Sequence, residues 1–385
     1  MSVRRARSTV QKSRALLAVA WVVGLGTGPA CAEYHLYWGD VHGHTSISDG
    51  KGDLDHYLTY ARDTAGLDFV IVTDHDFGNA APWRMPEAAW QLTQERVEAY
   101  TVPGQFVAIA GYEWTSQPKY WSEVGPELVS ERLFPGAPRF LNHKNVYFPS
   151  PVGSILSAKD PAYYTPELLA AAVRAAGGLI QNNHPSAGED GRDQFAYAPW
   201  CSAVIANTEI GADVVWYEGH AYQTNMERVV RHYLNSGGKT GLVKGTDTHE
   251  GEPAARTAVL AEDLTREAIF EALRHRRNYA VSSARIVLRF TIDGHQMGEE
   301  IEVTGRPRLA VDIRGTDRIA EVEIIRDGVS ILRRHPRGRR ARFAHVDDTF
   351  RGSSYYYLRV TQADTDQYGN PSYAWSSPIW VGKKR

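Results

Sequence analysis

The sequence predicts an α/β barrel with a parallel sheet, followed by a small β-sandwich. Between residues 33 and 284, apolar runs of strand length alternate about seven times with segments of helical periodicity, a pattern typical of parallel strands joined by helices. From about Arg285 onward, short segments alternate apolar and polar residues, and turns containing glycine separate them without intervening helices. Strands of this kind favour a β-sandwich over residues 285–385.

Ahead of the barrel, residues 1–32 predict a secretory signal peptide. Basic residues precede an apolar run at 15–25, and the small residues Ala30 and Ala32 stand just before Glu33. This order is that of an exported protein's leader, and the apolar run is too short for a comfortable membrane span. We therefore expect a periplasmic or secreted protein, without a transmembrane segment in the mature chain.

The barrel elements can be followed along the chain. The run "FVIV" at 69–72 predicts a buried strand, and it follows a helical segment, 53–65, that begins at an aspartate cap. The segments "QFVAIAGYEW", "KNVYF", "GGLIQNNHP", "SAVIANTEI" and "TGLVKGTDTH" predict further strands. Helices are expected between several of them, at 86–100, 165–176, 222–235 and 265–276.

Charge and cysteine content narrow the class of partner and of metal site. The formal net charge of -2 disfavours binding of extended nucleic acid, although a small basic pocket remains open. The arginine-rich segment 337–342 is interpreted as a solvated loop, with contact to an anionic partner as the alternative. Cleavage after Ala32 would leave Cys201 as the remaining cysteine, so no internal disulfide is expected. Any metal must then be held by nitrogen and oxygen atoms.

Polar residues recur where the predicted strands end. His42 and His44 follow the first strand, and an H-x-H pair alone is weak support for a metal. The carboxyl ends of barrel strands open onto one face, however, so residues far apart in sequence would converge there. The other strand-end residues are Asp74, His75, Glu113, His184, Asp247 and His249.

With Asp49 and His143 added, the chain resembles the polymerase and histidinol phosphatase (PHP) superfamily. The motifs "HGHTSISDG", "TDHD", "GYEW", "NHKNVYF", "NHP" and "GTDTH" occur in that order. The opening and the ending of the chain are similar to an uncharacterised, frequently exported branch. This resemblance implies a distorted seven-stranded β/α barrel, residues 33–284, with up to three metal ions at the C-terminal face.

The resemblance also implies three sets of ligands. His42, His44, Glu113 and Asp247 would hold one ion, and Glu113 would bridge to a second ion held by His143 and His184. Asp49, His75 and His249 would surround the third. Imidazoles mixed with carboxylates suit zinc, manganese or iron, and so many histidines without a metal would repel one another below neutral pH. We therefore expect two or three divalent ions as cofactors.

Such a site predicts hydrolysis of a small phosphate mono- or diester by a metal-activated hydroxide, with Glu113, Asp247 and His249 as the catalytic candidates. Lys144 and Arg256 are the first candidates to bind the phosphate, ahead of Arg192 and Lys244. Three alternatives stay open at this point. They are a nuclease or nucleotide phosphatase acting on short nucleic acid, a non-catalytic metal-containing binding module, and a metal-dependent amide or lactone hydrolase.

Overall fold

The computed structural model describes residues 33–77, 84–115, 143–150, 154–163, 166–185 and 204–384. The predicted signal peptide, Arg192 and Cys201 lie outside these residues. Among the helices that are described, none is long and apolar enough to cross a membrane.

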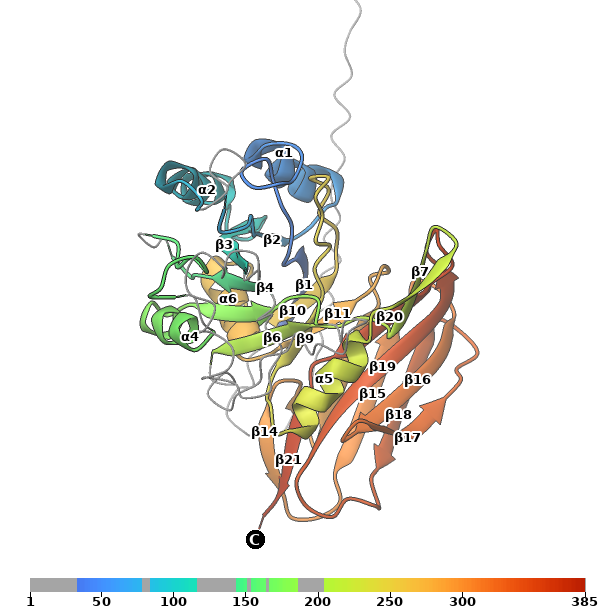
Figure 1. The fold of residues 1–385 in the computed structure, drawn as a ribbon. Coiled ribbons are helices and arrows are strands. Elements are labelled where there is room, and N and C mark those ends of the chain that lie inside the picture. Colours follow the sequence, from blue (N-terminus) through green and yellow to red (C-terminus); the bar gives the residue numbers. More distant parts are fainter. Residues whose placement is uncertain are drawn as a thin grey trace, which may run out of the picture.

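The part of the chain predicted as a barrel is a mixed α/β structure (Figure 1). Its strands are β1 (His35–Asp40), β2 (Phe69–Val72), β3 (Val107–Thr115), β4 (His143–Tyr147), β5 (Leu179–Asn182), β6 (Ile205–Glu209), β7 (Val214–Tyr217), β8 (His220–Gln223), β9 (Gly241–Val243), β10 (Thr257–Ala261) and β11 (Asn278–Val281). Its helices are α1 (Leu54–Thr59), continued by a π-helical turn (Tyr60–Thr64), α2 (Glu87–Tyr100), α4 (Pro166–Ala175), α5 (Met226–Asn235) and α6 (Arg266–Arg274).

The sheet is mixed rather than parallel, which corrects the prediction. Strands run in the order β11-β10-β1-β2-β3-β4-β5-β6-β9. The pairs β1–β2, β2–β3, β5–β6 and β6–β9 are parallel, whereas β4 is antiparallel to both of its neighbours. Strands β10 and β11 are antiparallel as well. A sequence pattern of alternating strands and helices did not reveal these reversals, because strand direction depends on how each connection crosses the sheet.

A closed seven-stranded barrel is not confirmed. No backbone ladder joins β9 to β11 in the described chain, and side chains bridge the gap instead. Asn278 Nδ2 donates to the carbonyl of Leu242 over 3.0 Å, and the Leu242 amide donates to Ser377 Oγ over 2.8 Å. Strands β9 and β11 are therefore held together by buried amide and hydroxyl groups rather than by strand pairing.

Apolar side chains cover both faces of the central strands. In β2 and β3, Ile71 and Ile109 pack in one buried cluster with Phe270 and Leu273 of α6. The alternate positions Val70, Val72, Ala108 and Ala110 belong to a second cluster that also contains residues of α1, α2 and α4. Because successive strand residues face opposite sides, the strands are a layer between α6 and the other helices. The buried polar residues His42, His44, Asp74 and His75 follow the carboxyl ends of β1 and β2.

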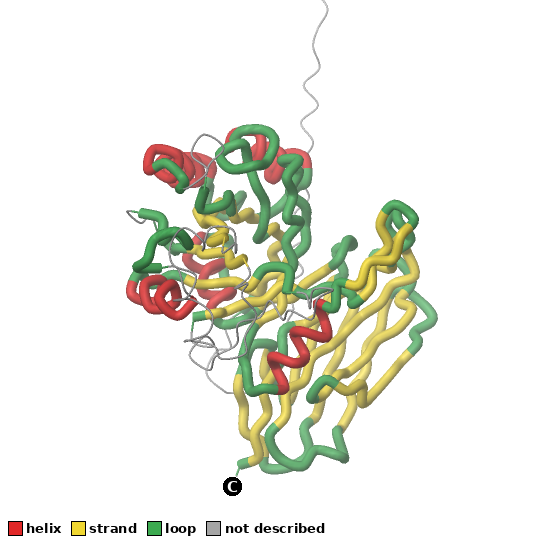
Figure 2. The backbone as a smooth tube through the Cα atoms, viewed as in Figure 1, coloured by secondary structure: helices red, strands yellow, loops and turns green. Residues whose placement is uncertain are grey.

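The C-terminal part of the described chain consists of strands and loops (Figure 2). Its strands are β12 (Val287–Ile292), β13 (His295–Gln296), β14 (Glu300–Val303), β15 (Arg308–Arg314), β16 (Ile319–Arg326), β17 (Val329–Arg334), β18 (Arg340–Val346), β19 (Ser354–Thr365), β20 (Pro371–Ser376) and β21 (Ile379–Lys383). Strands β14, β16, β17, β19, β20 and β21 belong to the same sheet as the first part. Strand β20 pairs with β11, so backbone hydrogen bonds connect this part to the first. A separate antiparallel sheet, β13-β12-β15-β18, completes the all-β region.

One expected helix begins later than its sequence pattern indicated. The helix expected from Tyr222 begins at Met226, because residues 214–223 form the antiparallel hairpin β7–β8. Asn225 marks the boundary with a φ of 55°, a left-handed conformation that asparagine tolerates better than most residues. The hairpin exposes Trp216 and Tyr222, which are 50% and 49% accessible.

Candidate metal centre

The polar residues that follow the predicted strands lie close together in the structure. His42 and His44 follow β1, His75 follows β2, and Glu113 lies within β3. Isolated bridges pair Gly43 with Thr248 and His75 with Glu113, so the loops that follow the strands are tied to one another. All nine ligand candidates contact one another as a single cluster: His42, His44, Asp49, His75, Glu113, His143, His184, Asp247 and His249.

Glu113 occupies the middle of this cluster. Its carboxylate is 1% exposed and contacts five imidazoles. Oε1 lies 3.1 Å from His143 Nδ1, 3.3 Å from His42 Nε2 and 3.5 Å from His184 Nε2. Oε2 lies 2.8 Å from His75 Nδ1 and 3.6 Å from His44 Nε2. The two oxygens thus face different histidines, as a bridging carboxylate requires.

Two further carboxylates extend the cluster toward solvent. Asp247 Oδ1 lies 3.1 Å from His44 Nε2 and 3.3 Å from His42 Nε2. Asp49 lies 3.3 Å from His249 Nε2 and 3.4 Å from His75 Nε2. The side chains of Asp49, Asp247 and His249 are 41–42% exposed, whereas His42 and His44 are fully buried. The cluster therefore has a buried floor and an open side.

Four overlapping groups of these residues have ligand atoms within 4.8 Å of one another. His44, Asp49, His75 and His249 form the largest, and Glu113 belongs to two others. The groups are His44-Asp49-His75-His249, His42-Glu113-His184, His42-His44-Asp247 and His75-Glu113-His143. They overlap with the three sets expected from sequence but do not reproduce them. His44 joins the Asp49 set, and His143 and His184 fall in different groups, one with His75 and the other with His42.

Electrostatic interactions within the cluster shift the pKa values of its members. Burial would raise the pKa of Glu113, but the neighbouring imidazoles His143, His75 and His42 hold it well below its usual range. Burial lowers the pKa of His75, yet the charges of Glu113 and Asp49 outweigh burial and raise it to about 10. The pKa of His44 is lowered, because burial outweighs its carboxylate contacts. The carboxylates are therefore held ionised by neighbours of opposite charge.

The donor set fits divalent ions. His44 Nδ1 is buried and has no hydrogen-bond partner among the described residues, and such atoms in native proteins call for a specific explanation. Imidazole nitrogens and carboxylate oxygens suit zinc, manganese and iron. A metal ion bound by these residues would give His44 Nδ1 a partner. Coordination would also remove the repulsion between crowded histidines that become protonated.

Glu209 is a site residue that the sequence reasoning missed. This carboxylate, at the end of β6, is 3% exposed. It accepts hydrogen bonds from His42 Nδ1 over 3.0 Å, from the His184 amide over 2.7 Å and from the Gly245 amide over 3.1 Å. Because Nδ1 of His42 donates to Glu209, the lone pair on Nε2 faces Glu113 and Asp247. The signal was present, since Glu209 also follows an apolar strand run.

Two other buried aspartates stabilise the loops that carry candidate ligands, through hydrogen bonds to backbone amides and hydroxyl groups. Asp74 accepts four hydrogen bonds from the amides and hydroxyls of Thr45 and Ser48, at 2.7–3.1 Å. Asp40 accepts from the backbone amides of His42, Thr246 and Ala254. These contacts fix the loop that carries Asp49 and the loop that carries Asp247.

Backbone geometry is unusual at two of the candidate ligands. His184 and Asp247 have positive φ angles of 24° and 53°, which cost energy for residues with a Cβ atom. Close packing accompanies this geometry, since a Cβ on Gly245 would lie 2.1 Å from His42 Cβ. The chain thus tolerates local strain where it presents His184 and Asp247 to the cluster.

The cations proposed to bind phosphate are placed less favourably. His143 and Asn145 both contact the cluster region, and Lys144 between them pairs with Trp114 across the strands. Strand alternation therefore directs Lys144 to the opposite face, and its predicted role is not supported. Arg256 donates to the carbonyl of Ser282. Its role as a phosphate ligand stays a prediction.

Comparisons with known proteins show relatives whose function is not described. The family model "Protein of unknown function (DUF3604)" matches residues 76–124 and 188–303, which is less than half of the chain. An uncharacterized protein of Chlamydia trachomatis is 28% identical over 381 residues, and one of Chlamydia muridarum is 27% identical over 380 residues. Each alignment covers 90% of this chain and 57% of the relative. The chain thus spans little more than half the length of these relatives.

Among solved structures, the chain is similar to one from Bacteroides vulgatus described as "a two-domain protein containing predicted PHP-like metal-dependent phosphoesterase". The identity is 15% and the TM-score is 0.46, and the match covers 91% of this chain and 95% of the other. At this degree of similarity, the function of the chain has to be inferred from its own site.

Proposed function

We propose that this protein is a metal-dependent phosphoesterase that hydrolyses a small phosphate mono- or diester. The observation that supports the proposal best is the position of Glu113, a buried carboxylate whose two oxygens face five imidazoles at 2.8–3.6 Å. Glu113 would bridge neighbouring ions, with His143 and His184 completing the set on one side and His42, His44 and Asp247 on the other. Two or three bound divalent ions would supply a hydroxide near neutral pH and neutralise the charge of the phosphoryl oxygens.

The candidate ligands form a buried group and an exposed group, which would have different roles in hydrolysis. His42, His44 and Glu113 form the buried floor, where exclusion of water strengthens every electrostatic contact. Asp49, Asp247 and His249 line the open side, so a substrate would approach past them. Lys244 is a cation that interacts electrostatically with Glu209 and Asp247, and among the described residues its ammonium has no hydrogen-bond or ion-pair partner. It is a better candidate than Lys144 to meet a phosphate, since it lies three residues before Asp247 on the connection from β9.

Hydrolysis of p-nitrophenyl phosphate and of its bis-ester, with manganese, zinc or iron supplied, tests this proposal. We expect turnover of at least one ester, and a loss of more than about a hundred-fold in the Glu113→Gln variant, because an amide cannot bridge two cations. The variant should lose bound metal in parallel. Glu271→Gln, which changes a half-exposed helix residue, is the matched control.

Two outcomes would contradict the proposal. Full turnover by Glu113→Gln would exclude a bridging role for this carboxylate. Hydrolysis of carboxylic esters, amides or lactones without hydrolysis of either phosphate ester would assign the site to carbonyl chemistry instead.

A further inference from the structure

The separate sheet of the C-terminal part bears a dense group of arginines on one face. Arg289 of β12 pairs with Asp312 of β15, which pairs with Arg342 of β18. In the next row, Arg314 of β15 pairs with Arg340 of β18. Paired residues and every second residue along a strand share a face, so these side chains lie together. The group, called the arginine face below, consists of Arg289, Arg308, Arg314, Arg340 and Arg342.

This face points to solvent. All five arginines are exposed, and the side chain of Arg342 is 83% accessible. The alternate residues of the same strands, among them Phe290, Val311 and Ile313, are at most 2% exposed and pack into the core. The sheet is therefore apolar on one side and cationic on the other.

The charge of the arginine face is largely uncompensated. Asp312 is the only acidic residue at its paired positions, and it contacts Arg342 over 3.7 Å. The other four arginines make no ion pair with a described residue. Side chains of like charge on neighbouring strands destabilise a sheet. In a chain whose formal net charge is -2, this concentration of positive charge has no evident structural benefit.

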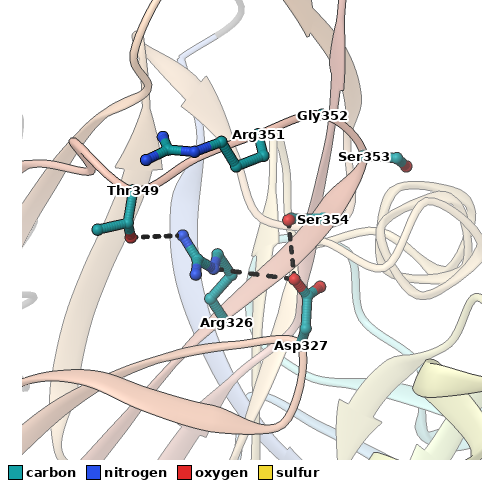
Figure 3. Close-up of a pocket in the computed structure, with 7 residues that line it drawn as sticks. All are labelled: Arg326, Asp327, Thr349, Arg351, Gly352, Ser353 and Ser354. Atoms are coloured by element: carbon teal, nitrogen blue, oxygen red, sulfur yellow. Dashed lines mark hydrogen bonds and ion pairs between the residues drawn. The ribbon is translucent and has the colours of Figure 1, made fainter.

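Arginines elsewhere in the same region are used differently. In the pocket of Figure 3, Arg326 donates to Thr349 and pairs with Asp327 over 3.8 Å. Outside the drawn residues, Arg326 also pairs with Asp347 over 2.6 Å. Arg351 of that pocket donates to the backbone carbonyl of Asp348. These guanidinium groups are engaged within the protein, whereas four of the five in the arginine face make no ion pair with a described residue and are available to a partner.

We propose that the arginine face binds the surface of a membrane rich in anionic phospholipids. Guanidinium groups pair with phosphate through parallel hydrogen bonds, and a sheet face presents them in one layer to a planar array of headgroups. The residues between them are small or aliphatic, including Ala310, Ala344 and Val346. No aromatic residue stands at the exposed positions of these strands to stack on bases, and no helix is offered to a DNA groove. The observations therefore favour a lipid surface over nucleic acid.

The inference is independent of the proposed hydrolytic function. None of its residues belongs to the metal cluster, and membrane binding needs no metal. Hydrolysis in solution and binding to vesicles can therefore fail separately.

Cosedimentation of the full chain with vesicles of phosphatidylcholine, with and without phosphatidylglycerol, tests the proposal. We expect binding to the anionic vesicles alone, weakening as salt is added. The triple variant Arg289→Gln, Arg314→Gln and Arg340→Gln should bind on the order of a hundred-fold more weakly. Removing the one carboxylate of the face by Asp312→Asn should strengthen binding several-fold.

The control changes net charge equally at exposed arginines outside this sheet: Arg84→Gln, Arg174→Gln and Arg228→Gln. It should retain most of the binding. Circular dichroism of each variant checks the fold. Equal binding by the two triple variants, or no binding of the unaltered chain to anionic vesicles, would overturn the proposal. Binding of a duplex oligonucleotide that the first triple variant abolishes, without vesicle binding, would assign the face to nucleic acid.

Discussion

At the scale of single residues, the candidate site depends on carboxylates that hold histidines in one orientation. Glu209 fixes Nδ1 of His42, so that Nε2 faces Glu113 and Asp247. It also accepts the amide of His184, whose backbone has a positive φ. One buried carboxylate therefore positions two candidate ligands from different strands, without contributing to any of the four ligand groups.

Glu209→Gln should weaken metal binding by roughly ten- to a hundred-fold. Glutamine keeps the size of the side chain, but one of the two acceptor oxygens becomes an amide nitrogen, which cannot accept a hydrogen bond. The variant therefore cannot accept from both His42 and the amide of His184 as Glu209 does. Titration with zinc or manganese against a chromophoric chelator measures the change, and Glu271→Gln is the control. An unchanged affinity in a folded Glu209→Gln protein would show that His42 needs no such support.

Most of the candidate ligands could be predicted from the sequence, because one rule applied to many positions. The rule that polar residues follow apolar strand runs identified the histidines and carboxylates that converge in the structure. It applied equally to Glu209 in "IANTE", which the sequence reasoning did not single out. Lys144 was chosen for a different reason, its adjacency to His143. Neighbouring positions in a strand face opposite sides, so this reason gives little support, and the role of Lys144 stays a prediction.

At the scale of elements, helix α5 is joined to the C-terminal strands by a buried network of charged groups. Glu227 of α5 is 2% exposed and accepts hydrogen bonds from Tyr357 and from Arg359, both over 2.8 Å. Arg359 also donates to Glu323 of β16 over 2.7 Å. Figure 1 shows α5 lying against this sheet, beside β19. The helix that follows the β7–β8 hairpin is therefore fixed to the all-β region.

This network predicts a loss of stability in acid. Burial would raise the pKa of Glu227, but Arg359 and Arg231 lower it below its ordinary value. A carboxylate with a depressed folded pKa stabilises the protein above its unfolded pKa of about 4.3, and this contribution is lost as pH falls through the folded pKa. At pH 7, Glu227→Gln should therefore be less stable by about 3 kcal/mol, because it removes the buried negative charge that lies between Arg231 and Arg359.

Urea denaturation of both proteins at several pH values measures this difference. The gap between the unaltered protein and Glu227→Gln should be full at pH 7 and should narrow as the pH falls below about 4. A gap that is the same at all pH values would mean that the charge of Glu227 does not matter. The metal cluster is common to both proteins, so its own titration cancels in the comparison.

Prediction from sequence was less complete for elements than for residues. Most strands and helices lie where their periodicity placed them, because a buried face requires that periodicity. Strands β10 and β11, the direction of β4 and the β7–β8 hairpin were not foreseen. The direction of β4 depends on how its connections cross the sheet, whereas the hairpin is local and lay within a segment whose end was read as helical.

At the scale of the whole molecule, one sheet runs from the candidate site into the all-β region through the pairing of β11 with β20. Helix α6 fills one side of the central strands, and the polar cluster lies beyond their carboxyl ends. The sequence indicated two regions of different character, but it did not indicate their shared sheet. The predicted boundary near residue 285 stays a prediction, and the arginine face lies entirely beyond it.

The central claim is that these side chains bind metal together, and anomalous X-ray diffraction from crystals grown with zinc or manganese tests it most directly. We predict two or three peaks within the cluster, one of them beside the Glu113 carboxylate and another among His44, Asp49, His75 and His249. Metal that binds elsewhere on the protein, with no peak at Glu113 in a protein that still hydrolyses phosphate esters, would contradict the account.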